Sequence, residues 1–592
     1  MNVTPPRTPG AAQPTVPSAR TAPPTEGGTE PAPASRGFLA KAALITAALS
    51  VAGALLGLAR DQALARLFGA GSETDAFLVA WTVPEFAATL LIEDGLALVL
   101  IPAFSLALSR RARGAPGDPV RALVATTLPR LSLALITSGG LVVVGAPFLV
   151  GALAPGLTDP GLAVDCTRLT ATCVVTFGLA GYCSAALRAH RRFLAPAAIY
   201  VAYNTGIITT MLVLSGRWGV RSAALGVAVG GCLMVALQLP SLWRQLRGRS
   251  AGGPAEEDGE AQRRMGLALV CAVLLFSLCR QSQVLIERFL ASHLDAGAIS
   301  HLNYAQKVAQ IPMTLSLMLV TVTFPVVARA LADGDGERAR DRVERDLALA
   351  ACIVLLGAAT VVACGPQMIE LLFQRGAFTA RDTAATAEVM RVYALGLLGQ
   401  TLVGALVRTY FSDGRPSWYP LAAMAAGVAA TGGIGACTVG LWGVSGIAAA
   451  NAAGITLTAG MLLGGARARR GRRAPNGDTP PDAPTAPDAP TPTDAATSST
   501  SPAPTARTVV PLRLRHVLAD LGRPIVAAAG ATVAGAFAAS RFEAPLPGLL
   551  LGCLTVAVVF VLLGRALGEQ GVVSALRSVR SVTRRLAHAR SR

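Results

Sequence analysis

The chain has 592 residues, of which 52% are hydrophobic and only 15% are charged, and its mean hydropathy is +0.52. Soluble globular proteins carry about 25% charged residues, so this composition indicates a helical membrane protein. It excludes a soluble enzyme, a secreted disulfide scaffold and a wholly disordered chain. The net charge of +18 calls for no nucleic-acid partner, because the cytoplasmic loops of membrane proteins collect Arg and Lys.

Three segments of the chain are polar and of low complexity. Residues 1–36 are rich in Pro, Thr, Ala and Gly. They are expected to form a disordered cytoplasmic tail, and they do not resemble a signal peptide. Residues 466–508 begin with a cluster of Arg and continue with repeated Pro, Thr, Asp and Ala, which predicts a disordered linker. Residues 569–592 are expected to form a basic cytoplasmic tail.

Between these segments lie about fourteen apolar runs, most of them long enough for a transmembrane helix of about 20 residues. They lack the short alternating strands of an outer-membrane barrel, so an all-α polytopic membrane protein is predicted. We expect a six-helix N-terminal lobe at 37–245, a cytoplasmic loop at 246–264, a six-helix C-terminal lobe at 265–465 and two helices within 509–568. The expected spans are 38–59, 75–107, 122–153, 167–187, 193–215, 218–243, 265–290, 297–331, 346–373, 383–411, 417–440, 443–465, 524–540 and 546–568.

The arginines predict the orientation of these helices. They gather after the even-numbered spans, whereas the loops after odd-numbered spans are shorter and poorer in Arg. Because cytoplasmic loops are enriched in Lys and Arg, both termini are expected in the cytoplasm, with the chain in a bacterial cytoplasmic membrane. The Arg-rich stretches lie at 110–121, 188–192, 244–264, 329–345, 415 and 467–473.

A weak internal repeat relates the two halves. Aligning Pro84 with Pro312 also matches Gly69 with Gly297, and the tripeptide Trp-Gly-Val recurs at 218–220 and 442–444. Chains rich in Ala and Gly also produce chance identities. Two matching blocks at nearly the same offset nevertheless suggest two related lobes in parallel orientation, an arrangement that places a substrate site between the lobes near the membrane midplane.

Charged residues inside apolar spans cost about 2.5–3.5 kcal/mol each, so they normally face a cavity or a partner. Arg60 and Asp61 end the first span, where they form either an interfacial pair or a cationic group at a cavity mouth. Gly69 and Gly71 then allow tight turns. Asp75 follows, either as a cap of the next helix or as a residue with a role in transport.

The second span is interrupted by Pro84-Glu85, by the acidic tripeptide at 93–95 and by Pro102. Pro and Gly within a span leave backbone groups that must be satisfied in protein or in a wet cavity. This irregular, acidic segment is therefore expected to line a cavity.

Spans seven and eight carry further charges, namely Arg280, Glu287, Arg288 and Lys307. The first three are expected to form either a local ion-pair group or part of a cavity. Lys307 shares a helix face with Asn303, Gln306 and Gln310, five residues before Pro312. A polar stripe with a cation is hard to place against lipid, so a cavity-facing role is expected for Lys307.

No catalytic or metal-binding pattern is found in the sequence. It has no GxSxG, Walker, HExxH or Asp-rich motif, and its ten Cys and five His show no ligand spacing. Most of the Cys lie in apolar stretches and are interpreted as small buried residues. The sequence therefore predicts a protein that is not an enzyme and that has no metal ion or cofactor.

Several motifs resemble the MurJ/MviN family of the MATE-like (MOP) exporter superfamily. The resemblance extends over about 40–465, and the polar loop motif that contains Arg375 and Gly376 is its most specific part. The motifs are GLARD at 57–61, LFGAG at 67–71, TDAF at 74–77, the spacing of Pro84, Gly95 and Pro102, FLAS at 289–292, Tyr304-Ala305 and LFQRGAFT at 372–379.

This resemblance implies a lipid II flippase, which would move undecaprenyl-pyrophosphate-linked peptidoglycan precursor across the membrane by alternating access. Arg60 and Asp75 match functional residues of the family, and Lys307 stands where the family typically has an Arg. The resemblance further implies a monomer and a drive from the membrane potential or an ion gradient. The resemblance is also compatible with cell-wall synthesis proteins as partners.

The chain departs from the family pattern at five positions where the family has charged residues: Ala54, Ala88, Thr89, Gln306 and Gln310. Either Arg280 and Arg288 compensate, or the cargo differs. The alternatives are an exporter of another lipid-linked glycan, a small-molecule antiporter, and a membrane scaffold for cell-wall assembly that does not transport. A membrane glycosyltransferase would need acids or His at one membrane face, which the chain does not present convincingly.

Overall fold

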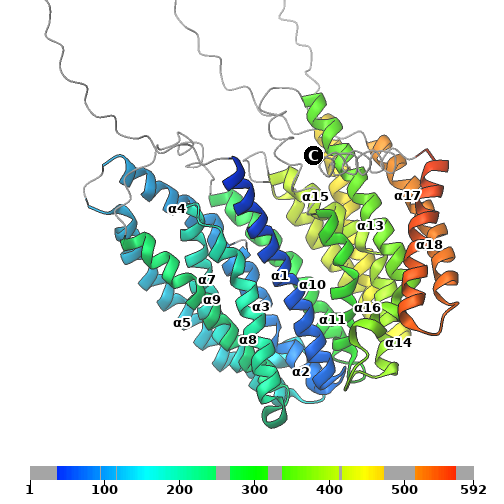
Figure 1. The fold of residues 1–592 in the computed structure, drawn as a ribbon, viewed down its shortest axis with the longest axis horizontal. Coiled ribbons are helices and arrows are strands. Elements are labelled where there is room, and N and C mark those ends of the chain that lie inside the picture. The colour runs from blue at the N-terminus through cyan, green and yellow to red at the C-terminus, as the bar shows by residue number, and fades with distance from the viewer. Residues whose placement is uncertain are drawn as a thin grey trace, which may run out of the picture. The chain divides into compact units, whose positions relative to one another are not determined.

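The computed structural model describes residues 36–93, 95–114, 117–247, 267–317, 336–411, 417–471 and 514–568. In these ranges the regular elements are all helical (Figure 1). The expected tails and linker lie outside the described residues, apart from Arg36 and residues 466–471. The chain forms two units, Met1–Ile45 and Thr46–Arg592, and the relationships described below lie within the second.

The N-terminal lobe consists of the helices up to residue 247. In this lobe α8 and α9 pack closely together, α7 packs on α4 and α9, and α6 packs on α2, α5 and α9. Its elements are α1 (Arg36–Phe68), α2 (Ser72–Ala80), α3 (Thr82–Ala87), the π-helix η1 (Ala88–Glu93), α4 (Gly95–Ala112), α5 (Pro119–Leu153), α6 (Pro160–Thr170), α7 (Thr172–Ala189), α8 (Leu194–Trp218) and α9 (Arg221–Arg247).

The C-terminal lobe follows, and a final helix pair packs against one of its members. Helices α10 and α14 both contact α16, α11 packs on α14, and the final pair α17 and α18 lies against α13. The elements are α10 (Leu267–Ala291), α11 (Ala298–Ala309), α13 (Gly336–Phe373), α14 (Ala380–Ala394), α15 (Leu397–Phe411), α16 (Tyr419–Gly471), α17 (Leu514–Ala539) and α18 (Pro545–Ala566).

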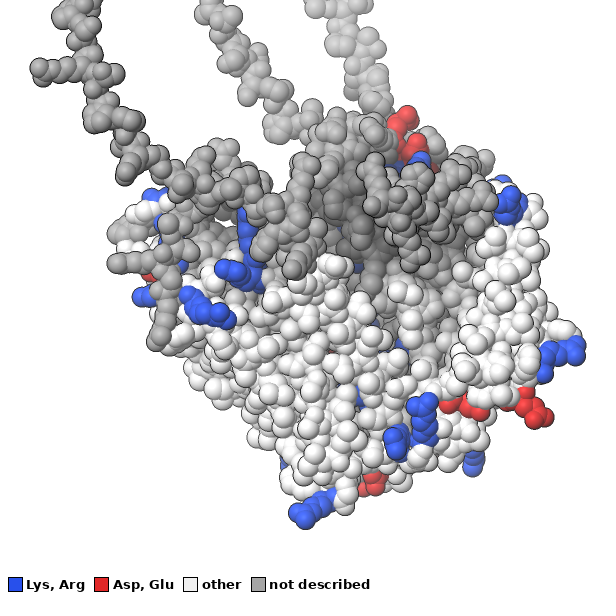
Figure 2. All heavy atoms as spheres, in the orientation of Figure 1, with Lys and Arg blue, Asp and Glu red and all other residues white. Residues whose placement is uncertain are grey.

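The described residues contain eleven helices that are long and apolar enough to cross a membrane, or twelve if the bent pair α14–α15 forms one span. The expected spans 417–440 and 443–465 both fall in α16, which is divided by a kink at Gly443, where the backbone leaves the helical conformation. The expected span 297–331 is described only as far as residue 317. On the face shown in Figure 2, the described charged side chains gather mainly toward the two ends of the helices, as expected for a membrane protein.

The second span is irregular, as its Pro and Gly residues predict. It is divided into α2, α3, η1 and α4, and a π-helical turn of this kind often marks a functional site. A Cβ atom on Gly181 of α7 would lie 1.9 Å from the Leu91 carbonyl oxygen, so the wide turn of η1 fits only against a glycine. Asp94, which follows η1, lies outside the described residues.

Backbone conformations support the internal repeat. Gly69 and Gly297 precede α2 and α11 and have positive φ angles of 68° and 101°. Gly219 and Gly443 have nearly the same conformation, with φ 53° at both and ψ of −142° and −130°. Left-handed φ values are accessible mainly to glycine, so a positive φ recurs at both matched pairs of glycines. The boundaries proposed for the lobes as separate domains stay a prediction.

Candidate functional site

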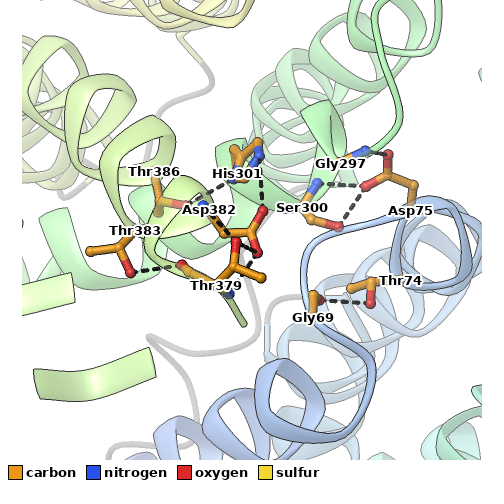
Figure 3. Close-up of polar contacts among 10 residues, drawn as sticks. All are labelled: Gly69, Thr74, Asp75, Gly297, Ser300, His301, Thr379, Asp382, Thr383 and Thr386. Atoms are coloured by element: carbon orange, nitrogen blue, oxygen red, sulfur yellow. Dashed lines mark hydrogen bonds and ion pairs between the residues drawn. The ribbon is translucent and has the colours of Figure 1, made fainter. Parts of the chain in front are cut away.

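At one end of the helices, an aspartate of the N-terminal lobe binds the start of a helix in the C-terminal lobe (Figure 3). Asp75 Oδ2 accepts a hydrogen bond of 2.7 Å from the Gly297 amide. Its Oδ1 accepts bonds of 2.8 Å and 2.5 Å from the amide and the hydroxyl of Ser300. The first amides of a helix have no partner within it and favour a negative charge, so Asp75 caps α11 and joins the two lobes.

The alternative that Asp75 caps its own helix is therefore wrong. The N-cap of α2 is Gly71, and no side chain bonds there. The Thr74 hydroxyl donates instead to the Gly69 carbonyl oxygen at 2.9 Å. Asp75 lies one turn inside α2 and reaches across to the other lobe.

Backbone contacts also join the two lobes at this end. The Ala377 amide donates to the Arg66 carbonyl oxygen at 2.9 Å, so the loop that follows α13 bonds directly to the end of α1. A Cβ atom on Gly376 would lie 2.3 Å from that carbonyl oxygen, and one on Gly69 would lie 2.7 Å from the Ala377 carbonyl oxygen. The lobes thus meet backbone to backbone, and Gly69 and Gly376 permit the approach. We call these contacts, together with those of Asp75, the closed end.

A second polar group within the C-terminal lobe braces the closed end (Figure 3). Thr379 and Asp382 form a capping box at the start of α14. His301 of α11 bonds through Nδ1 to the Thr386 hydroxyl at 2.9 Å, and its Nε2 lies 4.0 Å from Asp382. Arg375, which follows α13, is exposed, and within the described residues its side chain donates only to the Leu371 carbonyl oxygen of that helix, so this motif contributes its backbone to the closed end.

A second site lies farther along α1, around Arg60. Its guanidinium donates to Asp61 Oδ1 at 3.0 Å and 2.7 Å and to the Asn204 side-chain oxygen at 3.2 Å. It also lies over the ring of Trp81, 4.4 Å from the centroid. Arg60 is therefore held in place by a carboxylate, an amide and an aromatic face, a cation–π arrangement typical of Arg. Its side chain is 13% exposed.

An ion pair connects α3 with α10 across the two lobes. Arg288 Nη2 lies 2.9 Å from Glu85 Oε2, and Nη1 donates to the Thr82 hydroxyl. The Arg288 side chain is 6% exposed and that of Glu85 is 24% exposed. The guanidinium thus binds two residues one turn apart on α3.

Glu287, the neighbour of Arg288, faces its own lobe. Its carboxylate accepts a 3.0 Å hydrogen bond from the Tyr393 hydroxyl and another from the Asn451 amide group. The Tyr393 oxygen in turn accepts a 2.9 Å bond from the Gln306 amide. The alternative of a local ion-pair group in span seven is therefore wrong, because consecutive helix residues point in different directions.

Lys307 adds a third cation to the charges around Glu85. Lys307 is half-buried, and Lys307 and Arg60 both act electrostatically on the Glu85 carboxylate, which Arg288 binds directly. We call Arg60, Asp61, Glu85, Glu287, Arg288 and Lys307 the charge cluster, which contains three cations and three carboxylates.

Arg280 does not join this cluster. Its side chain is exposed, and no hydrogen bond or ion pair links it to the residues that the structure describes. Sequence reasoning also missed four residues that position the cluster, namely Trp81, Asn204, Tyr393 and Asn451. The two asparagines carried a usable signal, because an amide side chain in an otherwise apolar span needs a polar partner.

The structure and these sites define a class of protein: a two-lobed helical membrane protein with a MATE-like fold and a charged site between its lobes. A solved structure entitled "Lipid II flippase MurJ, inward closed conformation" matches with a TM-score of 0.64 and 17% identity, over 88% of this chain and 99% of that one. An inward-facing multidrug resistance MATE transporter of the MOP superfamily matches with a TM-score of 0.57 and 15% identity, over 73% of this chain and 99% of that one.

The family model described as lipid II flippase MurJ matches residues 64–474, and the chain belongs to this family. The lipid II flippase MurJ of Burkholderia cenocepacia is 28% identical over 385 residues, which cover 63% of this chain and 73% of the relative. The probable lipid II flippase MurJ of Rhizobium meliloti is 27% identical, over 60% of this chain and 68% of the relative.

Proposed function

We propose that this protein translocates lipid II, the undecaprenyl-pyrophosphate-linked peptidoglycan precursor, by alternating access. The observation that carries the proposal is that Arg288 binds Glu85 across the two lobes at 2.9 Å, while Arg60 and Lys307 act electrostatically on the same carboxylate. The family of the chain supports the choice of cargo.

The chemistry of the charge cluster suits a pyrophosphate. Arg presents a planar fork that binds phosphate oxygens in pairs, whereas Lys acts as a compact point charge. Arg60 and Arg288 come from different lobes, and Lys307 lies on α11, the helix that Asp75 caps. A bound pyrophosphate would therefore contact both lobes, and the lipid tail would remain among the apolar helix faces.

The closed end supplies one gate of an alternating-access cycle. We place the Arg-rich ends of α4, α7 and α9 in the cytoplasm by the positive-inside rule, which puts the closed end at the outer surface and both termini inside. Asp75 and the backbone contacts of Gly69 and Gly376 would then separate during cargo release.

The proposal also includes the oligomeric state, the location and the partners of the protein. The protein would act as a monomeric transporter rather than an enzyme, without a metal or cofactor, in the bacterial cytoplasmic membrane. Cell-wall synthesis proteins would be its partners, and the charge cluster would hold the cargo without changing it chemically.

Complementation tests the proposal. The full chain is expressed in a strain depleted of its own lipid II flippase, and growth with normal cell shape is expected. Failure despite normal accumulation in the membrane would contradict the proposal and favour an exporter of another lipid-linked glycan or a non-transporting scaffold.

A further inference from the structure

Among the acids of the charge cluster, Glu85 differs in the partner that it binds. Asp61 pairs with Arg60, its neighbour in α1. Glu287 accepts its bonds from Tyr393 and Asn451, both in its own lobe. Glu85 binds Arg288 of the other lobe, and two more cations lie in range of it.

We propose that Glu85 is an internal counter-anion that holds the place of the cargo's pyrophosphate and joins the lobes until cargo displaces it. This inference rests on the proposed function and adds a residue that controls loading of the site.

The guanidinium of Arg288 already has two partners on α3. Its two terminal nitrogens are directed at Glu85 and Thr82, so the ends of the guanidinium fork are already bonded to α3. Each bond uses one of the two N–H groups on its nitrogen, so a phosphate that binds this same pair of N–H groups must displace one of the α3 groups. Glu85 is the group that carries a charge, and it is the more exposed member of the ion pair.

The pyrophosphate of the cargo and the Glu85 carboxylate carry charges of the same sign. A pyrophosphate bound by Arg60, Arg288 and Lys307 would bring further negative charge beside the Glu85 carboxylate, and like charges in one poorly hydrated site repel strongly. Cargo and Glu85 therefore compete for the same cations.

Because the ion pair of Glu85 and Arg288 joins the two lobes, its loss would weaken the contact between them. The contacts of α3 with α10 join the two lobes, in addition to the more extensive contacts of α2 with α11 and of α5 with α10. Cargo that takes Arg288 from Glu85 removes one of these links. A ligand shifts a conformational equilibrium by its different affinity for the two states, so loading itself would loosen the lobes.

The test measures anion binding to the full chain in lipid nanodiscs by titration calorimetry. The probe is farnesyl pyrophosphate, and farnesol is the uncharged reference. E85Q keeps the shape of the side chain and removes its charge, and it is expected to bind the probe about tenfold tighter, the effect of about one released ion pair. Farnesol binding should not change.

E93Q is the matched control, because Glu93 lies on the same broken span but accepts its hydrogen bond from Tyr200 of the same lobe at 3.0 Å. E93Q should bind the probe as the parent does. The double variant E85Q/R288Q should lose the gain, since the freed cation is no longer present. A gain in affinity is not an effect that mere structural damage would produce.

The outcomes separate the two proposals. If E85Q binds the probe no tighter than the parent while R288Q and K307Q lose binding, the counter-anion is wrong and the cargo site stands. If R288Q and K307Q bind like the parent, the cargo site itself is wrong. Should E85Q fail to accumulate, E85D, which is one methylene shorter, replaces it; a smaller gain is then expected, and no gain contradicts the inference.

Discussion

Asp75 and Ser300, 225 positions apart in the chain, share two hydrogen bonds, at 2.8 Å from the Ser300 amide and 2.5 Å from its hydroxyl. This contact crosses from one lobe to the other and closes one end of the protein. Hydrogen bonds to charged groups contribute about 1.5–3 kcal/mol each, so the contact is a substantial part of what holds that end shut.

D75N is expected to loosen the closed end. The amides of Gly297 and Ser300 lose their charged acceptor and should exchange with solvent faster in hydrogen–deuterium exchange on nanodisc samples. D165N is the control, because Asp165 pairs with Arg221 inside the N-terminal lobe. Unchanged exchange over 297–300 in D75N would contradict the role given to Asp75.

G376A is expected to keep the closed end from forming. The new methyl would meet the Arg66 carbonyl oxygen, and the φ of +64° is itself unfavourable for alanine. Lipid II flipping in reconstituted vesicles should fall at least about tenfold, since a strain of about 1.4 kcal/mol already gives that factor. G71A has open space and no positive φ, and it should flip normally; equal activity of both variants would refute the prediction.

N451A and Y393F are expected to destabilise the C-terminal lobe. Each removes one donor to the Glu287 carboxylate, which is only 4% exposed. A buried charged acceptor that loses a bond costs about 1–3 kcal/mol, and the melting temperature in detergent should drop. T205V serves as control, because the exposed Thr205 hydroxyl donates to the Val201 carbonyl oxygen of its own helix. A drop in T205V as large as in N451A would speak against the Glu287 network.

G181A is expected to disturb the broken second span. The added methyl would clash with the Leu91 carbonyl oxygen of η1, whereas G140A in α5 would meet open space. Thermal stability should fall in G181A and should hold or rise in G140A, since alanine favours helix over glycine by about 0.5–1 kcal/mol. Stability of G181A equal to that of G140A would mean that η1 does not depend on this close approach.

Much of the fold could be predicted because membrane helices must be apolar over long runs. Arg60, Glu287, Arg288 and Lys307 could also be singled out, since a charge in such a run needs a polar environment. The π-helical turn of η1 could not be predicted, because hydropathy reports composition and not the register of backbone hydrogen bonds.

The partners of the charged side chains in the site could not be predicted from the sequence for a related reason. Arg288 and Glu287 are adjacent in the chain, yet neighbours on a helix do not face each other, and the partners are Glu85 in one case and Tyr393 with Asn451 in the other. Arg280 has the same kind of position in the sequence but stays outside the charge cluster. Only the packing of distant helices separates these outcomes.

The most direct test of the charge cluster as the cargo site is lipid II flipping by purified protein in vesicles, with K307A and R60A compared with R280A. We expect that K307A and R60A reconstitute normally but lose flipping, while R280A flips at the parent rate. Parent-rate flipping by both K307A and R60A would contradict the claim that the charge cluster holds the cargo.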